Sequence, residues 1–71
     1  MRKVYRIDVY IPNHGYSLAV SFDGNEKDVI EAALNANLFE CYDDKDIATA
    51  TDITNDEYER SIWDSLTIHE L

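Results

Sequence analysis

Hydrophobic and polar residues alternate through the first third of the chain, with the period of a half-buried β-strand. Within residues 3–11 the odd positions carry Tyr5, Ile7, Val9 and Ile11. Within residues 16–23 the even positions carry Tyr16, Leu18, Val20 and Phe22. Residues 12–15 between the two runs read Pro-Asn-His-Gly, which is typical of a turn. The pattern therefore predicts a β-hairpin whose two strands share one apolar face.

The next residues repeat their apolar positions every three or four places, which indicates an amphipathic helix. Asn25 is a good N-cap residue, and acids follow it where a first helical turn favours them. The repeating positions are Val29, Ile30, Ala33 and Leu34, followed by Asn37 or Leu38. Asn35 and Asn37 predict the end of the helix, because Asn often replaces Gly in the left-handed conformation found there. We expect this helix to lie on the apolar face of the hairpin.

Residues 38–42 allow two interpretations, a last helical turn or a short strand, and the extended interpretation is the one we adopt. Residues 47–53 alternate and are rich in β-branched side chains, so they predict a strand. With the polar residues 43–46 as its turn, this strand is expected to form a second hairpin with 38–42.

Thr54 and Glu57 have the spacing of a capping box, which predicts a second helix over about residues 55–65. Behind this box Tyr58, Ile62 and Leu66 repeat every four residues. The apolar residues within 61–71 also fall at even spacing, so a strand is the competing interpretation there. The last five residues receive no assignment.

The order of elements is thus β-β-α-β-β-α or, if 38–42 stays helical, β-β-α-β-α. Either order describes an α+β domain in which helices gather on one face of a small antiparallel sheet. The opposite face is expected to meet solvent or a partner through Arg6, Asp8, Ser17 and Ser21. With 71 residues, the chain is expected to form a single domain spanning 1–71.

Candidate chemistry is sparse. Cys41 is the only cysteine, so no disulfide within the chain is possible and a reducing, cytoplasmic location is expected. No window approaches the ~20 apolar residues of a membrane span. Neither His14 nor His69 lies in a motif that would activate a nucleophile. Asp44 and Asp46 begin a calcium-loop spacing, but Ala48 stands at its fifth position and its glycine is missing. We therefore expect no enzyme activity, cofactor or metal.

Charge is the strongest deviation from an ordinary composition, with fifteen acids against six bases and a net charge of −9. Residues 40–59 hold eight of the acids and one lysine, a net charge of −7. We expect turn and helix-start positions to bring these acids to one negative surface. The predicted partner-binding residues are Glu40, Tyr42, Asp43, Asp44, Asp46, Asp52, Asp56, Glu57, Tyr58 and Glu59.

Such a charge disfavours bare nucleic acid and anionic membranes and favours a basic protein surface as the partner. Carboxylates on a compact fold can occupy a groove built for DNA phosphates, so DNA mimicry is our hypothesis. In size, acidity and lack of catalytic residues the chain resembles the small anti-CRISPR and anti-restriction inhibitors of phages and mobile elements. This resemblance is one of type and covers no alignable stretch, so no functional positions follow from it.

Two other interpretations are open at this point. Acids at helix starts and in turns also serve as caps, turn formers and solubilising charges, without any partner. A different class of function is a structural module that forms a homodimer through a sheet edge or an aromatic face. Tyr10, Phe39 and Trp63 are the side chains that a core this small leaves hardest to place.

Overall fold

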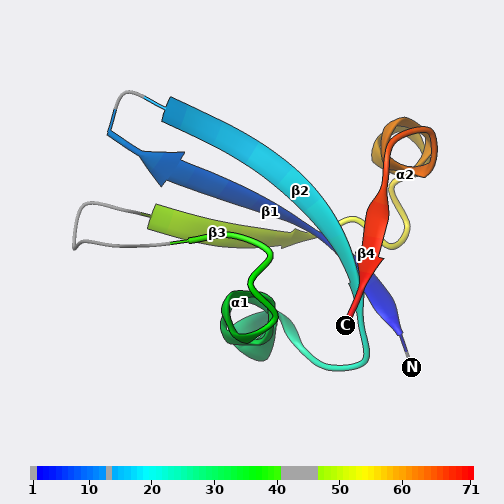
Figure 1. Ribbon diagram of the computed structural model, residues 1–71. Coiled ribbons are helices and arrows are strands. Elements are labelled where there is room, and N and C mark those ends of the chain that lie inside the picture. Colours follow the sequence, from blue (N-terminus) through cyan, green and yellow to red (C-terminus); the bar gives the residue numbers. More distant parts are fainter. Residues whose placement is uncertain (1, 13, 41–46) are drawn as a thin grey trace.

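The computed structural model describes residues 2–12, 14–40 and 47–71, and these form one sheet and two helices (Figure 1). The elements are β1 (Lys3–Ile11), β2 (His14–Phe22), α1 (Glu26–Asn35), β3 (Ile47–Asp52), α2 (Glu57–Asp64) and β4 (Ile68–Glu70). The strand order in the sheet is β3-β1-β2-β4. β1 is antiparallel to both β2 and β3, whereas β4 is parallel to β2. The predicted α+β class is confirmed, with a mixed sheet in place of a purely antiparallel one.

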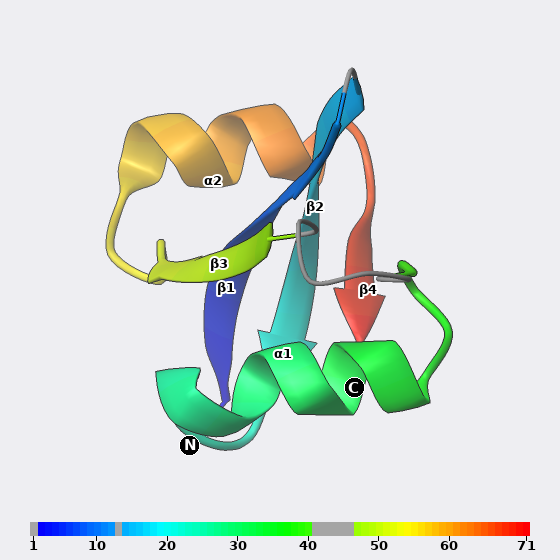
Figure 2. The ribbon, with the colours of Figure 1, turned by 90° about the vertical axis from the view of Figure 1, so that its left-hand side faces the viewer.

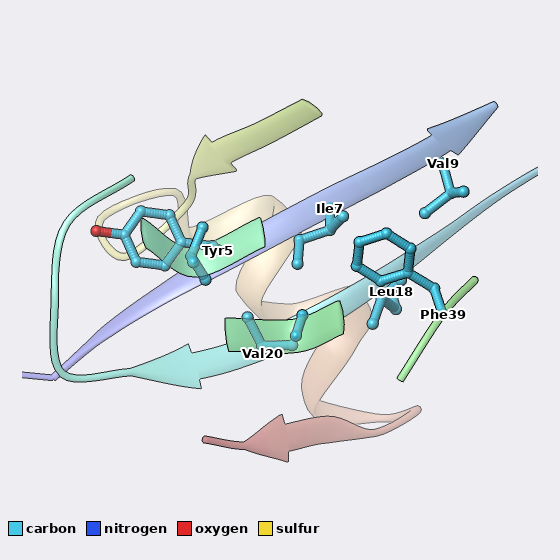
Figure 3. Packing of buried hydrophobic residues seen from close by; sticks show 8 residues of the cluster. Tyr5, Ile7, Val9, Leu18, Val20 and Phe39 are labelled. Atoms are coloured by element: carbon cyan, nitrogen blue, oxygen red, sulfur yellow. The ribbon is translucent and has the colours of Figure 1, made fainter. Parts of the chain in front are cut away.

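The main core lies between the β1–β2 hairpin and α1, as the alternation of the two strands predicts. The hairpin register places Tyr5 opposite Val20 and Ile7 opposite Leu18, so their side chains share one face of the sheet. Figure 3 shows this face with its side chains clustered. The buried cluster consists of Tyr5, Ile7, Val9, Leu18, Val20, Val29, Ala33 and Phe39. Its one hydroxyl, that of Tyr5, donates to the carbonyl of Gly24 at 2.9 Å, so the phenol oxygen has a partner despite its burial.

α1 begins and ends at the asparagines that the sequence indicated. Asn25 is the N-cap residue, although its side chain does not cap an N–H of the helix. At the other end Asn37 has a φ of 59°, in the left-handed region. The N–H of Asn37 donates to Leu34 and the N–H of Leu38 donates to Ala33, which together make a Schellman motif. The prediction for the end of this helix is therefore confirmed.

The prediction of a second hairpin is wrong for the residues that the structure describes. Residues 38–40 are not a strand, and β3 pairs with β1, so that Ile47 lies opposite Tyr10 and Asp52 opposite Tyr5. Phe39 accounts for the difference, since its side chain is buried in the main core directly after the helix. Residues 41 and 42, the other part of the predicted strand, lie outside the described residues.

The two helices lie on opposite faces of the sheet, which corrects the expectation that both share one face (Figures 1 and 2). α1 covers the face of Tyr5 and Ile7. α2 instead contacts Arg6, whose side chain lies on the opposite face of the sheet. In Figure 3, accordingly, α2 lies behind the strands. Ala19 is fully buried on this second face, so the face is covered in part and is not a solvent-exposed surface throughout.

The start of α2 also differs from the predicted capping box. Asp56 is the N-cap residue, and its carboxylate accepts from the N–H of Glu59 at 3.1 Å. The Thr54 hydroxyl is engaged elsewhere, because it accepts from the N–H of Val4 at 3.0 Å and donates to Asp52 at 2.6 Å. The N–H of Val4, near the start of β1, thus has the Thr54 hydroxyl as its acceptor. The helix is capped instead by the next suitable side chain, that of Asp56.

The C-terminal residues form β4, so the competing helix and strand interpretations of 61–71 each describe part of this segment. α2 occupies it up to Asp64, and Ile68–Glu70 then pairs with Ala19–Ser21 of β2. Arg2 supports this end of the sheet by donating to the carbonyls of Ser21 at 2.8 Å and Leu71 at 2.5 Å. Within the described residues, neither helix has the length and apolar character needed to cross a bilayer.

Candidate acidic binding surface

The ten predicted partner-binding residues fall into three groups, of which the first lies outside the described residues. Those outside the described residues are Tyr42, Asp43, Asp44 and Asp46. Glu40 is exposed and follows the end of α1 in the chain. Those at the end of β3 and the start of α2 are Asp52, Asp56, Glu57, Tyr58 and Glu59. The structure therefore places five of the ten at the β3–α2 junction.

The centre of this third group is an open hollow in the surface between β3 and α2. Its volume is about 670 Å³, and it is lined by Asp52, Asn55, Asp56 and Glu57. All four side chains are exposed, so three carboxylates lie around one shallow, open hollow in contact with water. Exposed carboxylates of this kind are accessible to a cationic group.

Hydrogen bonds within the loop hold this hollow in shape. One oxygen of Asp52 accepts from both the N–H and the hydroxyl of Thr54, at 2.9 and 2.6 Å. These two hydrogen bonds hold the pKa of Asp52 below its usual range, with a smaller contribution from the charge of Lys3. The N–H of Asp56 donates to the carbonyl of Ile53 at 3.0 Å before its carboxylate caps α2. The acids therefore build the turn and still expose their charge.

Basic residues of β1 neutralise this region only in part. Lys3 approaches Asp52 with 3.9 Å between the ammonium and the carboxylate, but both side chains are exposed. An exposed ion pair at this separation contributes little free energy and is screened by salt. Asp56 and Glu57 form no ion pair with the described basic residues. The hollow therefore keeps a net negative charge.

Glu59 has a different environment from its neighbours because it faces the sheet. Its two carboxylate oxygens accept from the Arg6 guanidinium at 2.6 Å and from the Trp63 indole N–H at 3.2 Å. Burial by itself would lower the pKa of Arg6. The hydrogen bonds and charges of Asp8 and Glu59 outweigh this effect, so the pKa of Arg6 is raised above its ordinary value. Glu59 thus joins α2 to β1, and its charge is balanced within the fold.

Tyr58 points away from the sheet, and two apolar residues that follow it are also exposed. The exposed fractions are 77% for Tyr58, 40% for Ile62 and 64% for Leu66. The four-residue repeat of these side chains signalled a helix correctly, but the half-buried residues of α2 are Glu59, Arg60 and Trp63, and Glu59 bonds to Arg6 of the sheet. Sequence reasoning therefore missed Ile62 and Leu66 as surface residues.

Metal binding and similarity to known proteins do not narrow the possible functions of this surface further. Within residues 2–12, 14–40 and 47–71, no three or more His, Cys, Asp or Glu side chains are grouped so that they could hold a metal ion. The acids considered for a calcium loop, Asp44 and Asp46, lie outside these ranges. Comparison of the chain with protein-family models, with curated proteins and with solved structures finds no match in any of the three.

Proposed function

We propose that this chain is a small acidic binding protein that occupies the basic surface of a nucleic-acid-binding protein and thereby inhibits it. The observation that carries this proposal is the hollow at the β3–α2 junction, where Asp52, Asp56 and Glu57 present three exposed carboxylates. Their backbone is already held by internal hydrogen bonds, so little conformational entropy is lost when a cationic surface binds them.

The charge of the whole chain favours the same kind of partner. A net charge of −9 produces an attractive field for a basic protein and speeds its association at low salt. The same field repels nucleic acid and anionic lipid, which makes a cationic protein surface the best electrostatic match. Surfaces that bind DNA carry Lys and Arg at close spacing, so a protein with clustered carboxylates can compete with DNA for them.

Affinity capture from a host lysate, washed at increasing salt, tests this proposal. The site variant combines Asp52→Asn, Asp56→Asn and Glu57→Gln, which removes three charges while Asn remains able to cap α2. The matched control combines Glu26→Gln, Asp28→Asn and Glu31→Gln on the exposed surface of α1 and removes the same charge.

We expect the natural chain and the control to capture a basic protein at low salt and the site variant to lose it. The captured protein should then lose affinity for its labelled nucleic acid when the natural chain is added, as measured by fluorescence anisotropy. Equal loss of capture in both variants, or a complex indifferent to salt, would exclude recognition through the hollow.

A second candidate function, self-association, is favoured by the position of β3. This strand is the outermost one on its side of the sheet, and it carries no charge before Asp52. Edge strands without charged residues or Pro can pair with another strand. Equilibrium sedimentation at two concentrations tests this function, and Thr49→Lys should abolish any dimer that forms through β3. A mass equal to one chain at both concentrations would exclude it.

A further inference from the structure

We propose that the partner engages the outward face of α2 with a basic amphipathic helix. This inference rests on the proposed function and deepens it by specifying the chemistry of the partner. Its basis is an arrangement along α2 in which an apolar stripe runs beside a row of acids.

The apolar stripe consists of Tyr58, Ile62 and Leu66. Tyr58 and Ile62 are one helical turn apart and therefore lie on the same side of α2. Leu66 follows just beyond the helix, where its N–H still donates to the carbonyl of Trp63 at 3.1 Å and continues the turn. All three are exposed, whereas the half-buried side of α2 carries Glu59, Arg60 and Trp63. The stripe is thus not used in the packing of α2 against the sheet.

The acidic row consists of Glu57 and Asp64. They are seven residues apart, which in an α-helix is two turns or about 10 Å along one side. The same geometry places the small residues Ser61 and Ser65 between this row and the stripe. Small side chains at this position allow the backbone of a second helix to approach α2 closely. Arg60, the one base of α2, is directed inward, where its guanidinium donates to the carbonyl of Thr54 at 3.3 Å.

Charge decides between the possible occupants of this face. A second copy of the chain would bring Glu57 and Asp64 close to the same acids of its own α2, with no base on that side to balance them. A helix with apolar residues at three- and four-residue spacing, flanked by Lys or Arg, would cover the stripe and pair with the acidic row. Helices that bind in this way are anchored by residues one turn apart, which is the spacing of Tyr58 and Ile62.

A synthetic peptide of about 16 residues, composed of Leu and Lys with helical periodicity, is the probe for this inference. A fluorophore at the N-terminus of the peptide reports binding through its fluorescence anisotropy. A scrambled peptide of the same composition retains the charge but loses the apolar face, and a Leu and Glu peptide retains the face but reverses the charge. We expect the scrambled peptide to bind about tenfold more weakly and the acidic peptide not to bind.

The critical variant is Tyr58→Gln with Ile62→Gln. Its matched control is Tyr10→Gln with Ile47→Gln, because these two residues are 56% and 54% exposed at the far end of the sheet and lose the same apolar groups. We expect the stripe variant to bind the peptide at least about tenfold more weakly and the control to stay within about twofold. Asp64→Asn should weaken binding about twofold at low salt and have no effect at high salt.

Equal effects of the stripe variant and its control, or equal binding of the ordered and scrambled peptides, would overturn the inference. So would self-association of the natural chain that the stripe variant abolishes, because the occupant would then be a second copy. Capture from the lysate separates this inference from the proposed function. If the site variant loses the partner and the stripe variant retains it, the proposed function stands and the helix inference fails. If the natural chain binds the peptide through the stripe but captures no basic protein, the proposed function fails.

Discussion

The two faces of the sheet are covered by helices that are attached in different ways. α1 packs on its face through apolar side chains, with Val29 and Ala33 fully buried. α2 has no fully buried residue and is joined to the other face by Glu59, which accepts from Arg6 and Trp63. Burial of apolar area contributes most of the free energy of folding in small domains, so we expect the α1 face to contribute most of the stability of this chain. The α2 face can therefore carry exposed apolar and acidic groups.

The two helices are also expected to differ in how readily they open. A helix held by a few polar contacts opens at a lower free energy than one with residues in the core. We therefore expect amide protons of α2 to exchange before those of β1 and β2. Binding of a partner to the stripe and hollow would slow this exchange without changing the core.

The largest loss in the free energy of unfolding is expected from Ile7→Ala, on the α1 face. Ile7 is fully buried in the core cluster, and truncation of a buried isoleucine costs about 2–5 kcal/mol. Urea unfolding measures the loss, with Thr51→Ala on the exposed side of β3 as a control expected to stay within about 0.5 kcal/mol. A loss below about 1 kcal/mol for Ile7→Ala would contradict the view that the α1 face dominates stability.

Arg6→Met should have a smaller and more local effect. It leaves the half-buried carboxylate of Glu59 without its guanidinium partner, which costs about 1–2 kcal/mol. We expect faster hydrogen exchange in α2 and altered fluorescence of Trp63, while the protection of β1 and β2 is retained. The double variant with Glu59→Gln should recover part of the loss, and equal loss of protection throughout the chain would show that both faces unfold together.

Asp56→Ala tests the N-cap of α2. Loss of its hydrogen bond from the N–H of Glu59 should lower the free energy of unfolding of the helix by about 1 kcal/mol. Asp56→Asn preserves the acceptor and should restore most of that loss. If both substitutions lower the stability equally, the charge of Asp56 rather than its hydrogen bond stabilises α2.

Asp52 should make a small contribution to the dependence of stability on pH. Its pKa is lowered in the folded chain by hydrogen bonds from Thr54, below an ordinary value of 3.8. The stabilisation is therefore fully present above about pH 4 and is lost as the pH falls through the lowered pKa. Urea unfolding between about pH 6 and pH 3 should show that the free energy of unfolding falls less steeply toward low pH for Asp52→Asn than for the natural chain. An equally steep fall in both chains would contradict this assignment.

The smallest effect on stability is expected from the stripe variant, Tyr58→Gln with Ile62→Gln. Both side chains are exposed, so the free energy of unfolding should change by about 0.5 kcal/mol or less. Urea unfolding followed by circular dichroism checks this expectation. A larger loss would mean that the stripe packs within the fold and is not available to a partner.

Local chemistry determined several features of this protein. Alternation in residues 3–11 and 16–23 was enough to predict the hairpin and its buried face, because the side chains of a strand point to opposite faces in turn. The left-handed end of α1 at Asn37 was likewise predictable, because few residue types adopt a positive φ at low cost. The sequence also located part of the candidate site, since the acids from Asp52 to Glu57 lie together in the chain as well as in space.

Only the tertiary structure decided how these pieces combine. β3 could have paired with residues 38–42 by its composition alone, but Phe39 entered the core and the free edge of β1 became the partner of β3. The four-residue repeat of Tyr58 and Ile62 indicates a helix but not which of its sides packs. That choice depended on Arg6, which lies more than fifty residues earlier and draws the opposite side of α2 to the sheet through Glu59. Pairing partners and packing faces are set by contacts between distant residues, and local periodicity contains no information about those contacts.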